Sequence, residues 1–190
     1  KMIKFFDAIV IGGGPAGGQT ARQLSKAGHQ VLLAERYPSF EDNNFSSAGM
    51  TLEPLEEFDL PEKVVGRYWK NLVIQCTQEA YTWNSEKPRG VVLDFAKLRQ
   101  FLADETTANG SKVLMGHRYI KKQVVADGVI VDFVEAKTSK TIQYKAKIVV
   151  DATGPVRKVM YDNKDEQPLM VLGSGLEYLI KVNQDIYDQY

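Results

Sequence analysis

This chain of 190 residues contains one cysteine and two histidines, carries no net charge and has no long apolar run. The single cysteine, Cys76, cannot form an internal disulfide, so the composition favours a reducing, cytoplasmic setting. The 24 Lys and Arg residues balance the 24 Asp and Glu residues, which gives no electrostatic case for a nucleic-acid partner. No apolar stretch reaches the roughly 18 residues that a membrane-spanning helix needs. Peripheral contact with a membrane surface stays compatible with the sequence.

The scarce residue types also offer no catalytic group. His29 and His117 have neither a triad nor the spacing of metal ligands, so we assign no catalytic residue and no metal. Cys76 lies in an apolar stretch, which predicts an inert, buried thiol. Tyr81 and Trp83 alternate along a predicted strand, and the pattern favours a sheet face that packs on the core.

The chain begins with a pattern typical of a strand–helix–strand unit. Residues 5–11 form an apolar run that ends in glycines, as strands buried on both faces do. A helix is predicted from Pro15 to Ala27, with Gly28 as its C-cap, and a second buried strand at 30–35. Such a unit predicts a parallel sheet with a right-handed crossover.

The glycines between the first strand and the helix follow the pattern G-x-G-x-x-G. Gly12 permits a tight turn, Gly14 lets a pyrophosphate approach the backbone, and Gly17 allows the helix to pack close to the strand. Pro15 and Ala16 open the helix, where backbone N–H groups and the helix dipole would face the phosphates. These five residues are therefore candidate ligands of a dinucleotide.

The second strand ends in Glu35, 18 residues after Gly17, where a carboxylate can accept from both ribose hydroxyls of an adenosine. Strand, glycines, helix and carboxylate together predict dinucleotide binding rather than a ligand-free turn. A P-loop is excluded because no Gly-Lys-Ser/Thr follows. Glu35 would repel the extra phosphate of NADP, and Arg36 beside it offsets this repulsion only in part.

A second motif, VVDATG at 149–154, is a strand that ends in Asp-Ala-Thr-Gly. With both motifs, the chain resembles the FAD-dependent oxidoreductases of the geranylgeranyl reductase type and, beyond them, the flavin monooxygenases and flavin-dependent halogenases. The resemblance covers most of the chain and implies FAD rather than NAD. It also implies that Ala152, Thr153 and Gly154 lie against the adenine and pyrophosphate.

The same resemblance implies further site residues. Where the reductases carry Cys-Gly-Gly near the flavin ring, this chain has Ser47, Ala48 and Gly49 in a polar loop, without the thiol. The family's phosphate-binding arginine at the start of a long helix matches Phe95, and Arg99, one turn later, is the nearest replacement.

The remaining elements follow from their patterns. Strands of a separate sheet are predicted at 71–77, 79–84 and 89–95, followed by a helix at 94–110, a strand at 112–116, a hairpin at 119–136 around Asp127-Gly128, a turn at 137–141, a buried strand at 147–154 and a new strand system at 168–182. The predicted fold class is α/β: a Rossmann-like FAD/NAD(P)-binding domain with a parallel sheet, a β-hairpin or meander insertion and the start of a substrate-domain sheet.

We expect four units along the chain. They are a βαβ dinucleotide-binding unit at 1–50, inserted strands of a substrate-side domain at 51–94, the remainder of the FAD-binding domain at 95–160 and the start of a truncated substrate domain at 161–190. The similar flavoproteins are usually far longer and carry a Gly-Asp pair that this chain lacks. The chain is therefore interpreted as the N-terminal portion of a longer oxidoreductase.

The resemblance implies reduction of carbon–carbon double bonds in a prenyl or other lipid-like substrate, with NAD(P)H or a ferredoxin as reductant. Two alternatives stay open: a flavin monooxygenase or halogenase, and a non-catalytic NAD- or ADP-binding module. The Trp-x-Trp-x-Ile-Pro motif of the halogenases does not occur in these 190 residues, which favours the reductase.

Overall fold

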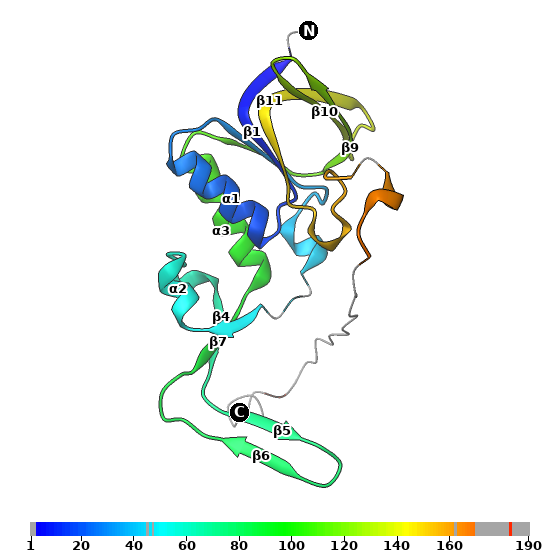
Figure 1. Ribbon diagram of the computed structural model, residues 1–190. Coiled ribbons are helices and arrows are strands. Elements are labelled where there is room, and N and C mark those ends of the chain that lie inside the picture. Colours follow the sequence, from blue (N-terminus) through cyan, green and yellow to red (C-terminus); the bar gives the residue numbers. More distant parts are fainter. Residues whose placement is uncertain (1–2, 45, 47, 162, 170–182, 184–190) are drawn as a thin grey trace.

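The computed structural model describes residues 3–44, 46, 48–161, 163–169 and 183. Its main sheet comprises β1 (Lys4–Ile11), β2 (Val31–Ala34), β8 (Lys112–Leu114), β9 (His117–Val125), β10 (Gly128–Glu135) and β11 (Thr141–Asp151). Their spatial order is β8-β2-β1-β11-β10-β9, of which β1, β11, β10 and β9 are labelled in Figure 1. Neighbours are parallel from β8 to β11, and β10 and β9 continue the sheet antiparallel. The α/β fold class and its Rossmann-like parallel sheet are confirmed.

The two strands at the centre of the parallel part are buried as their apolar runs predict. Val31, Leu32 and Leu33 of β2 are each 0% exposed. Successive side chains of a strand point to opposite faces, so these residues enter two different clusters. Leu32 packs with Phe133 of β10, whereas Val31 and Leu33 pack with Ala21 on the other face.

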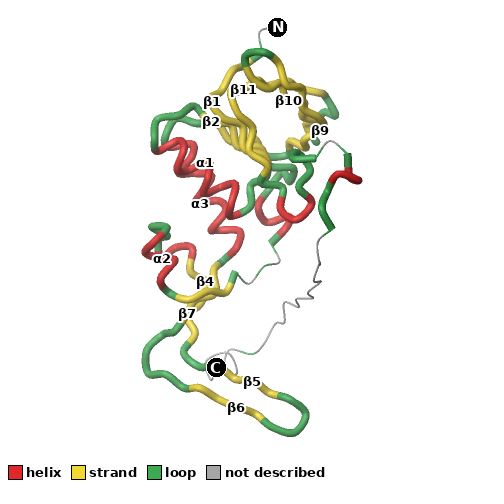
Figure 2. Tube along the Cα trace, in the orientation of Figure 1, coloured by secondary structure: helices red, strands yellow, loops and turns green. Residues whose placement is uncertain are grey.

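Two helices, α1 (Pro15–Lys26) and α3 (Phe95–Ala108), lie side by side against the main sheet (Figure 2). Their close approach depends on Gly18, because a Cβ atom there would lie 3.0 Å from the Cβ of Leu102. The helix α1 ends one residue earlier than predicted. Ala27 is its C-cap, and Gly28 follows at φ 88°, a left-handed conformation that favours glycine.

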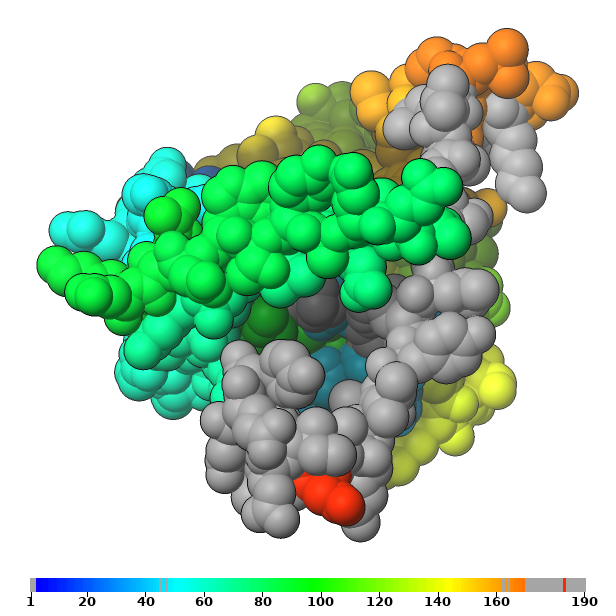
Figure 3. All heavy atoms as spheres, turned by 90° about the horizontal axis from the view of Figure 1, so that it is seen from below, coloured from blue at the N-terminus to red at the C-terminus, as the bar shows by residue number. Residues whose placement is uncertain are grey.

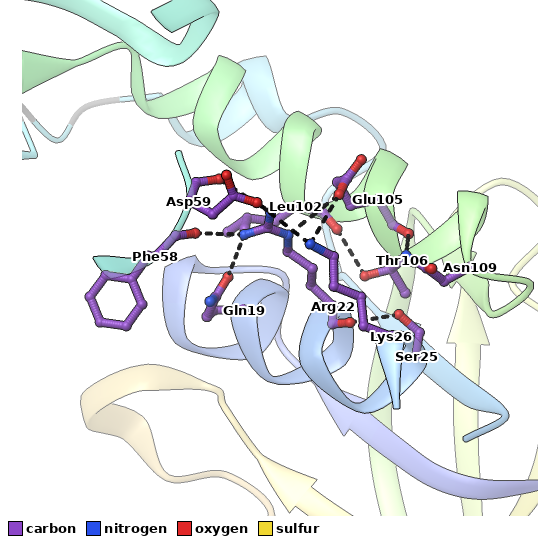
Figure 4. A network of polar contacts seen from close by, with 10 residues as sticks. All are labelled: Gln19, Arg22, Ser25, Lys26, Phe58, Asp59, Leu102, Glu105, Thr106 and Asn109. Atoms are coloured by element: carbon purple, nitrogen blue, oxygen red, sulfur yellow. Dashed lines mark hydrogen bonds and ion pairs between the residues drawn. The ribbon is translucent and has the colours of Figure 1, made fainter. Parts of the chain in front are cut away.

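A buried arginine joins both helices to the segment that follows α2 (Glu53–Glu57) (Figure 4). Arg22 of α1 is 1% exposed and donates to the carbonyl oxygens of Phe58 at 2.7 Å and Asp59 at 3.2 Å. Its Nε lies 3.6 Å from Glu105 Oε2 on α3. The Nη2 atom of Arg22 also lies 3.1 Å from Asp59 Oδ2. Lys26 lies near the same two carboxylates, at 3.7 Å from Asp59 and 3.5 Å from Glu105.

The middle of the chain forms two small sheets rather than the single separate sheet that the sequence predicts. The strands β3 (Gly49–Thr51), β7 (Gly90–Leu93) and β4 (Val65–Trp69) pair in that order, while β5 (Leu72–Gln75) pairs only with β6 (Ala80–Trp83) among the described strands. The pattern at 37–69 showed neither β3 nor β4, because both are short and β4 has a register shift between Val65 and Arg67. It also missed α2 and two 3-10 helices, η1 (Phe40–Asn43) and η2 (Glu62–Val64).

The β5–β6 hairpin projects from the body of the molecule and forms a ridge on the face seen in Figure 3 (Figures 1 and 3). Tyr81 is 56% exposed and Trp83 is 47% exposed, and their rings stack on each other at 6.3 Å. The prediction that they pack on the core is therefore wrong. Cys76, beside the hairpin turn, is also exposed, so the predicted buried thiol is wrong too. Backbone hydrogen bonds from Gln78 and Glu79 hold the pKa of this thiol below its usual range.

The later elements are present, but the strand predicted at 147–154 differs from its prediction. It is the end of β11, which begins at Thr141 and ends at Asp151, and it is not buried, because Lys147 is exposed and Ile148 is 54% exposed.

The predicted hairpin of β9 and β10 is present, but its two turn residues are Ala126 and Asp127, because Gly128 already pairs with Val125 as the first residue of β10. The turn before β11 includes Ser139 at φ 56°. The strand system expected at 168–182 lies almost wholly outside the described residues. Among the helices that the structure describes, none is long and apolar enough to cross a membrane.

Candidate functional site

The glycine loop joins β1 to α1 at the edge of the sheet where the parallel strands end. Gly12 adopts φ 111°, and a Cβ atom there would lie 2.2 Å from the carbonyl oxygen of Ala152. A Cβ atom on Gly17 would lie 1.9 Å from the carbonyl oxygen of Gly12. Real Cβ atoms do not approach so closely, so the fold itself requires glycine at both positions. The turn and packing roles expected for these two glycines agree with this geometry.

Gly14 is different, because a Cβ atom there would meet no heavy atom within 4 Å among the described residues. It is the N-cap of α1 at φ −70°, where its backbone suits other residue types as well. Pro15 and Ala16 begin the helix, and the first turn, which the structure describes in full, contains no acidic residue. The first N–H groups of a helix have no partner within the helix. This end of α1 therefore offers donors and a positive dipole end to an anion.

The carboxylate of Glu35 is buried at 7% exposure and is held by two backbone donors. Its Oε2 accepts from Gly13 N at 2.7 Å, and its Oε1 accepts from Tyr37 N at 2.9 Å. Its backbone is fixed from β8 and β9, since its N–H donates to Leu114 and its carbonyl accepts from His117. A carboxylate oxygen has two lone pairs, so Glu35 keeps acceptor capacity for ribose hydroxyls.

The Asp-Ala-Thr-Gly turn is organised by a residue that sequence reasoning did not single out. Asp151 Oδ1 accepts from the N–H of Thr153 at 3.0 Å and from its hydroxyl at 2.6 Å, while Oδ2 accepts from Val159 N at 2.8 Å and Met160 N at 2.7 Å. Burial acts to raise the pKa of Asp151, but these hydrogen bonds outweigh it and hold the pKa below its usual range. An aspartate side chain commonly accepts from the backbone two residues further on, and this turn signal could have indicated the role.

The structure brings the two motifs into contact. Ala152 N donates to Ile11 O at 2.9 Å, and its carbonyl oxygen lies over Gly12. Gly154 follows at φ 76°, and a Cβ atom there would meet nothing within 4 Å among the described residues. The glycine loop and the second motif therefore form one continuous surface at the sheet edge, as the strand order β1–β11 requires.

The other candidate residues lie as follows. Arg36 is exposed, donates to the hydroxyl of Tyr37 at 3.0 Å and lies 4.7 Å from its ring centroid. Arg99 is 3% exposed and donates to the carbonyl oxygens of η1. Ala48 adopts φ 43° and Gly49 begins β3, whereas Ser47 lies outside the described residues. In the part of the chain that is described, no three His, Cys, Asp or Glu side chains gather as metal ligands do.

A family model described as FAD dependent oxidoreductase matches residues 7–156, which is most of the chain. The chain belongs to the FAD-dependent oxidoreductase family. The match includes the glycine loop, the strand that ends in Glu35 and the Asp-Ala-Thr-Gly turn. The resemblance inferred from these motifs is thus confirmed, and the family's cofactor decides for FAD over NAD.

Two of the curated relatives that the chain matches are named as enzymes. The chain is 33% identical over 155 residues to a digeranylgeranylglycerophospholipid reductase of Haloferax volcanii, covering 79% of this chain and 36% of that protein. It is 27% identical over 180 residues to a 1H-pyrrole-2-carbonyl-[peptidyl-carrier protein] chlorinase of Pseudomonas fluorescens, covering 78% of this chain and 39% of that protein. The chain spans less than half the length of both relatives.

Solved structures of the same fold include a geranylgeranyl bacteriochlorophyll reductase-like protein from Thermoplasma acidophilum. It superimposes with a TM-score of 0.70 at 23% identity, covering 80% of this chain and 40% of that one. The myxobacterial chondrochloren halogenase, described as FAD-dependent, has a TM-score of 0.67 at 21% identity, covering 82% of this chain and 39% of that one. At these identities the likeness shows the fold.

The described residues fit the ADP half of FAD. The end of α1 carries backbone donors beside open space at Gly14, and Glu35 lies at the end of the next strand with lone pairs to spare. Among the described residues, no heavy atom lies within 4 Å of where a Cβ atom on Gly14 or Gly154 would be. An anionic pyrophosphate and a ribose suit this combination of donors and acceptor.

Proposed function

We propose that this chain binds the ADP half of FAD and serves an enzyme that reduces carbon–carbon double bonds in a prenyl or lipid-like substrate. The observation that carries the first part is the contrast among the three motif glycines. Gly12 and Gly17 are required by backbone packing, whereas at Gly14 the fold leaves open space. A glycine that the fold does not need is explained by a ligand that approaches its backbone.

Each group at the site has a role in this proposal. The N–H groups of the first turn of α1 bind the pyrophosphate, and Glu35 accepts from the adenosine ribose. The turn at Ala152, Thr153 and Gly154 lies against the adenine and pyrophosphate. FAD, when bound, supplies hydride transfer, and the residues described here bind and orient its ADP portion.

The assignment to double-bond reduction is supported by the 33% identity with the digeranylgeranylglycerophospholipid reductase. The reductant in this proposal is NAD(P)H or a ferredoxin, and the substrate is a small molecule or a lipid. A cytoplasmic setting with peripheral membrane contact belongs to the same proposal. The chlorinase relative, at 27% identity, favours oxygen chemistry of the monooxygenase or halogenase type as the second candidate.

Calorimetric titration with ADP, FAD and NAD tests the binding half. We expect ADP and FAD to bind and Gly14→Val to abolish both, because a branched side chain would occupy the space for the pyrophosphate. If neither ADP nor FAD bound to the folded wild-type chain, the proposal would be refuted.

The reaction is tested by anaerobic reduction of the flavin-loaded protein with dithionite, followed by addition of a geranylgeranyl lipid. Recovery of the visible absorbance of oxidised flavin, with a saturated product, supports the reductase. Recovery that needs oxygen, together with hydroxylation of the added lipid or, when a halide is also supplied, its halogenation, would move the assignment to the second candidate. A protein that binds ADP or NAD but never flavin would be a binding module.

A further inference from the structure

Arg99 of α3 is a buried guanidinium with a defined set of acceptors. It is 3% exposed, and its Nη2 donates to the carbonyl oxygens of Phe40 and Asn43, the second at 3.0 Å. Its Nε donates to Phe95 O at 3.3 Å, and the guanidinium carbon lies 4.4 Å from the centroid of the Phe95 ring. The helix α3 thereby fixes both ends of η1.

The side chain of Phe40, at the start of η1, reaches the glycine loop. Phe40 is 4% exposed, and its Cε1 atom lies 3.0 Å from where a Cβ atom on Gly13 would be. The Oε2 atom of Glu35 lies at the same 3.0 Å from that position, and it accepts the Gly13 N–H. Gly13 is therefore enclosed between an aromatic ring and a carboxylate. A displacement of Phe40 would loosen this enclosure.

The charges of Arg99 and Glu35 are also coupled. Burial lowers the pKa of Arg99, and attraction to Glu35 opposes this shift in favour of the charged form. The carboxylate of Glu35 is itself buried, at 7% exposure, and it accepts the backbone N–H groups of Gly13 and Tyr37.

We propose that Arg99 is a positioning residue for the adenosine half of the FAD site. It acts through Phe40 and η1 on Gly13 and Glu35, rather than through a contact with the phosphates. This inference rests on the proposed function, because it assumes that Glu35 binds the ribose. It gives a different role from the phosphate contact that the family resemblance implies, and one comparison distinguishes the two.

The comparison uses adenosine and ADP as probes, since only ADP carries the pyrophosphate. If Arg99 positions the adenosine side, Arg99→Met weakens binding of both probes by the same factor, about tenfold. Arg99→Lys recovers at least half of the change in log Kd that Arg99→Met causes, because an ammonium can still donate to carbonyl oxygens. A loss confined to ADP, with adenosine unchanged, would overturn the proposal and make Arg99 a phosphate ligand.

Phe40→Leu tests the step through the aromatic ring. It should weaken both probes equally, and the double variant with Arg99→Met should lose no more than the larger single loss, since both changes break one path. Fully additive losses would contradict the proposal. If Arg99→Met does not fold, the Phe40→Leu result decides alone.

A ligand-free measurement keeps this inference separate from the proposed function. Amide hydrogen exchange at Gly13 should be about tenfold faster in Arg99→Met, because the hydrogen bond to Glu35 is less well held. Unchanged exchange would refute the positioning role. If wild-type protein binds neither probe, the proposed function fails, while the exchange rate at Gly13 still tests the link from Arg99.

Arg22→Met is the matched control. Arg22 is 1% exposed, also donates to backbone carbonyl oxygens, and lies 4.8 Å from the centroid of the Phe101 ring, but it joins α1 to Phe58 and Asp59 instead of η1 (Figure 4). We expect this variant to lower the melting temperature without changing the Gly13 exchange rate in native conditions or the adenosine affinity. An equal effect of both arginine variants would reduce Arg99 to a general contributor to stability and overturn the proposal.

Discussion

The carbonyl oxygen of Ala152 occupies the position into which a side chain on Gly12 would project, with only 2.2 Å between that oxygen and a Cβ atom on the glycine. The glycine loop and the Asp-Ala-Thr-Gly turn, which lie far apart in the sequence, can therefore contact each other only because Gly12 has no side chain. The arrangement depends on β1 and β11 being neighbours in the sheet. The backbone packing therefore requires glycine at Gly12 and Gly17, whereas at Gly14 a side chain would have room.

The first prediction compares Gly17→Ala with Gly14→Ala. Gly17→Ala should cost about 3 kcal/mol or more of folding free energy, because its Cβ would lie 1.9 Å from the carbonyl oxygen of Gly12. Gly14→Ala should change stability by less than about 1 kcal/mol, since its Cβ would meet nothing within 4 Å in the described structure. It should nevertheless weaken ADP binding. Urea denaturation and calorimetry measure the two effects, and equal stability losses would contradict the assignment.

The second prediction concerns Glu35→Gln. Loss of the charge weakens the hydrogen bonds from Gly13 N and Tyr37 N and the expected bonds from ribose hydroxyls. We expect the free energy of ADP binding to become weaker by about 1–3 kcal/mol and the free energy of unfolding to fall by about 1 kcal/mol. Glu41→Gln, an exposed carboxylate on η1, is the control and should change neither. Undiminished ADP affinity in Glu35→Gln would remove Glu35 from the site.

The third prediction is a pH dependence that arises from Asp151. Because the folded protein holds the pKa of Asp151 below its unfolded value of about 3.9, its contribution to stability is present above that pH and is lost as the pH falls through the folded pKa. The stability difference between wild type and Asp151→Asn should therefore be largest above about pH 5 and shrink in acid. Urea denaturation at several pH values measures it. A difference that stays constant down to acid pH would show that the charge has no role.

The fourth prediction compares the two cations that lie between α1 and α3. Arg22→Met should destabilise the fold by about 3 kcal/mol, because it removes a guanidinium that is 1% exposed and leaves the carbonyl oxygens of Phe58 and Asp59 without this donor. Lys26→Ala removes a partly exposed amine at 3.5–3.7 Å from the carboxylates of Asp59 and Glu105 and should cost less than about 1 kcal/mol. Thermal and urea unfolding provide the measurement. Comparable losses would mean that burial does not set the strength of this network.

The βαβ unit and the long helix could be predicted because their signals are local. An apolar run that ends at Gly12 predicts a buried strand, Pro15 predicts a helix start, and Asp127-Gly128 predicts a hairpin turn. These features depend on residues that are near each other in the chain. The turn at Gly12 and the helix packing at Gly17 likewise follow from the motif.

What could not be predicted depends on contacts between distant segments. The alternation of Tyr81 and Trp83 is the same whether or not another layer covers the hairpin, so their exposure had no sequence signal. In the sequence, Arg22 resembles any polar helix residue, because its burial depends on contact with the distant segment at Phe58 and Asp59. Burial of Arg99 under η1 is of the same kind.

The pairing of β1 with β11 also has a consequence for the order in which the protein folds. Asp7 and Lys147, 140 positions apart, form an ion pair at 2.6 Å across these strands. Long-range pairing of this kind is entropically costly and slow. During synthesis, the first βαβ unit can collapse early, but its glycine loop acquires the Ala152 contact only after the ribosome has released β11. Until then the apolar edge of β1 stays without its partner strand, and we expect this to be the interval in which the nascent chain is most prone to aggregate.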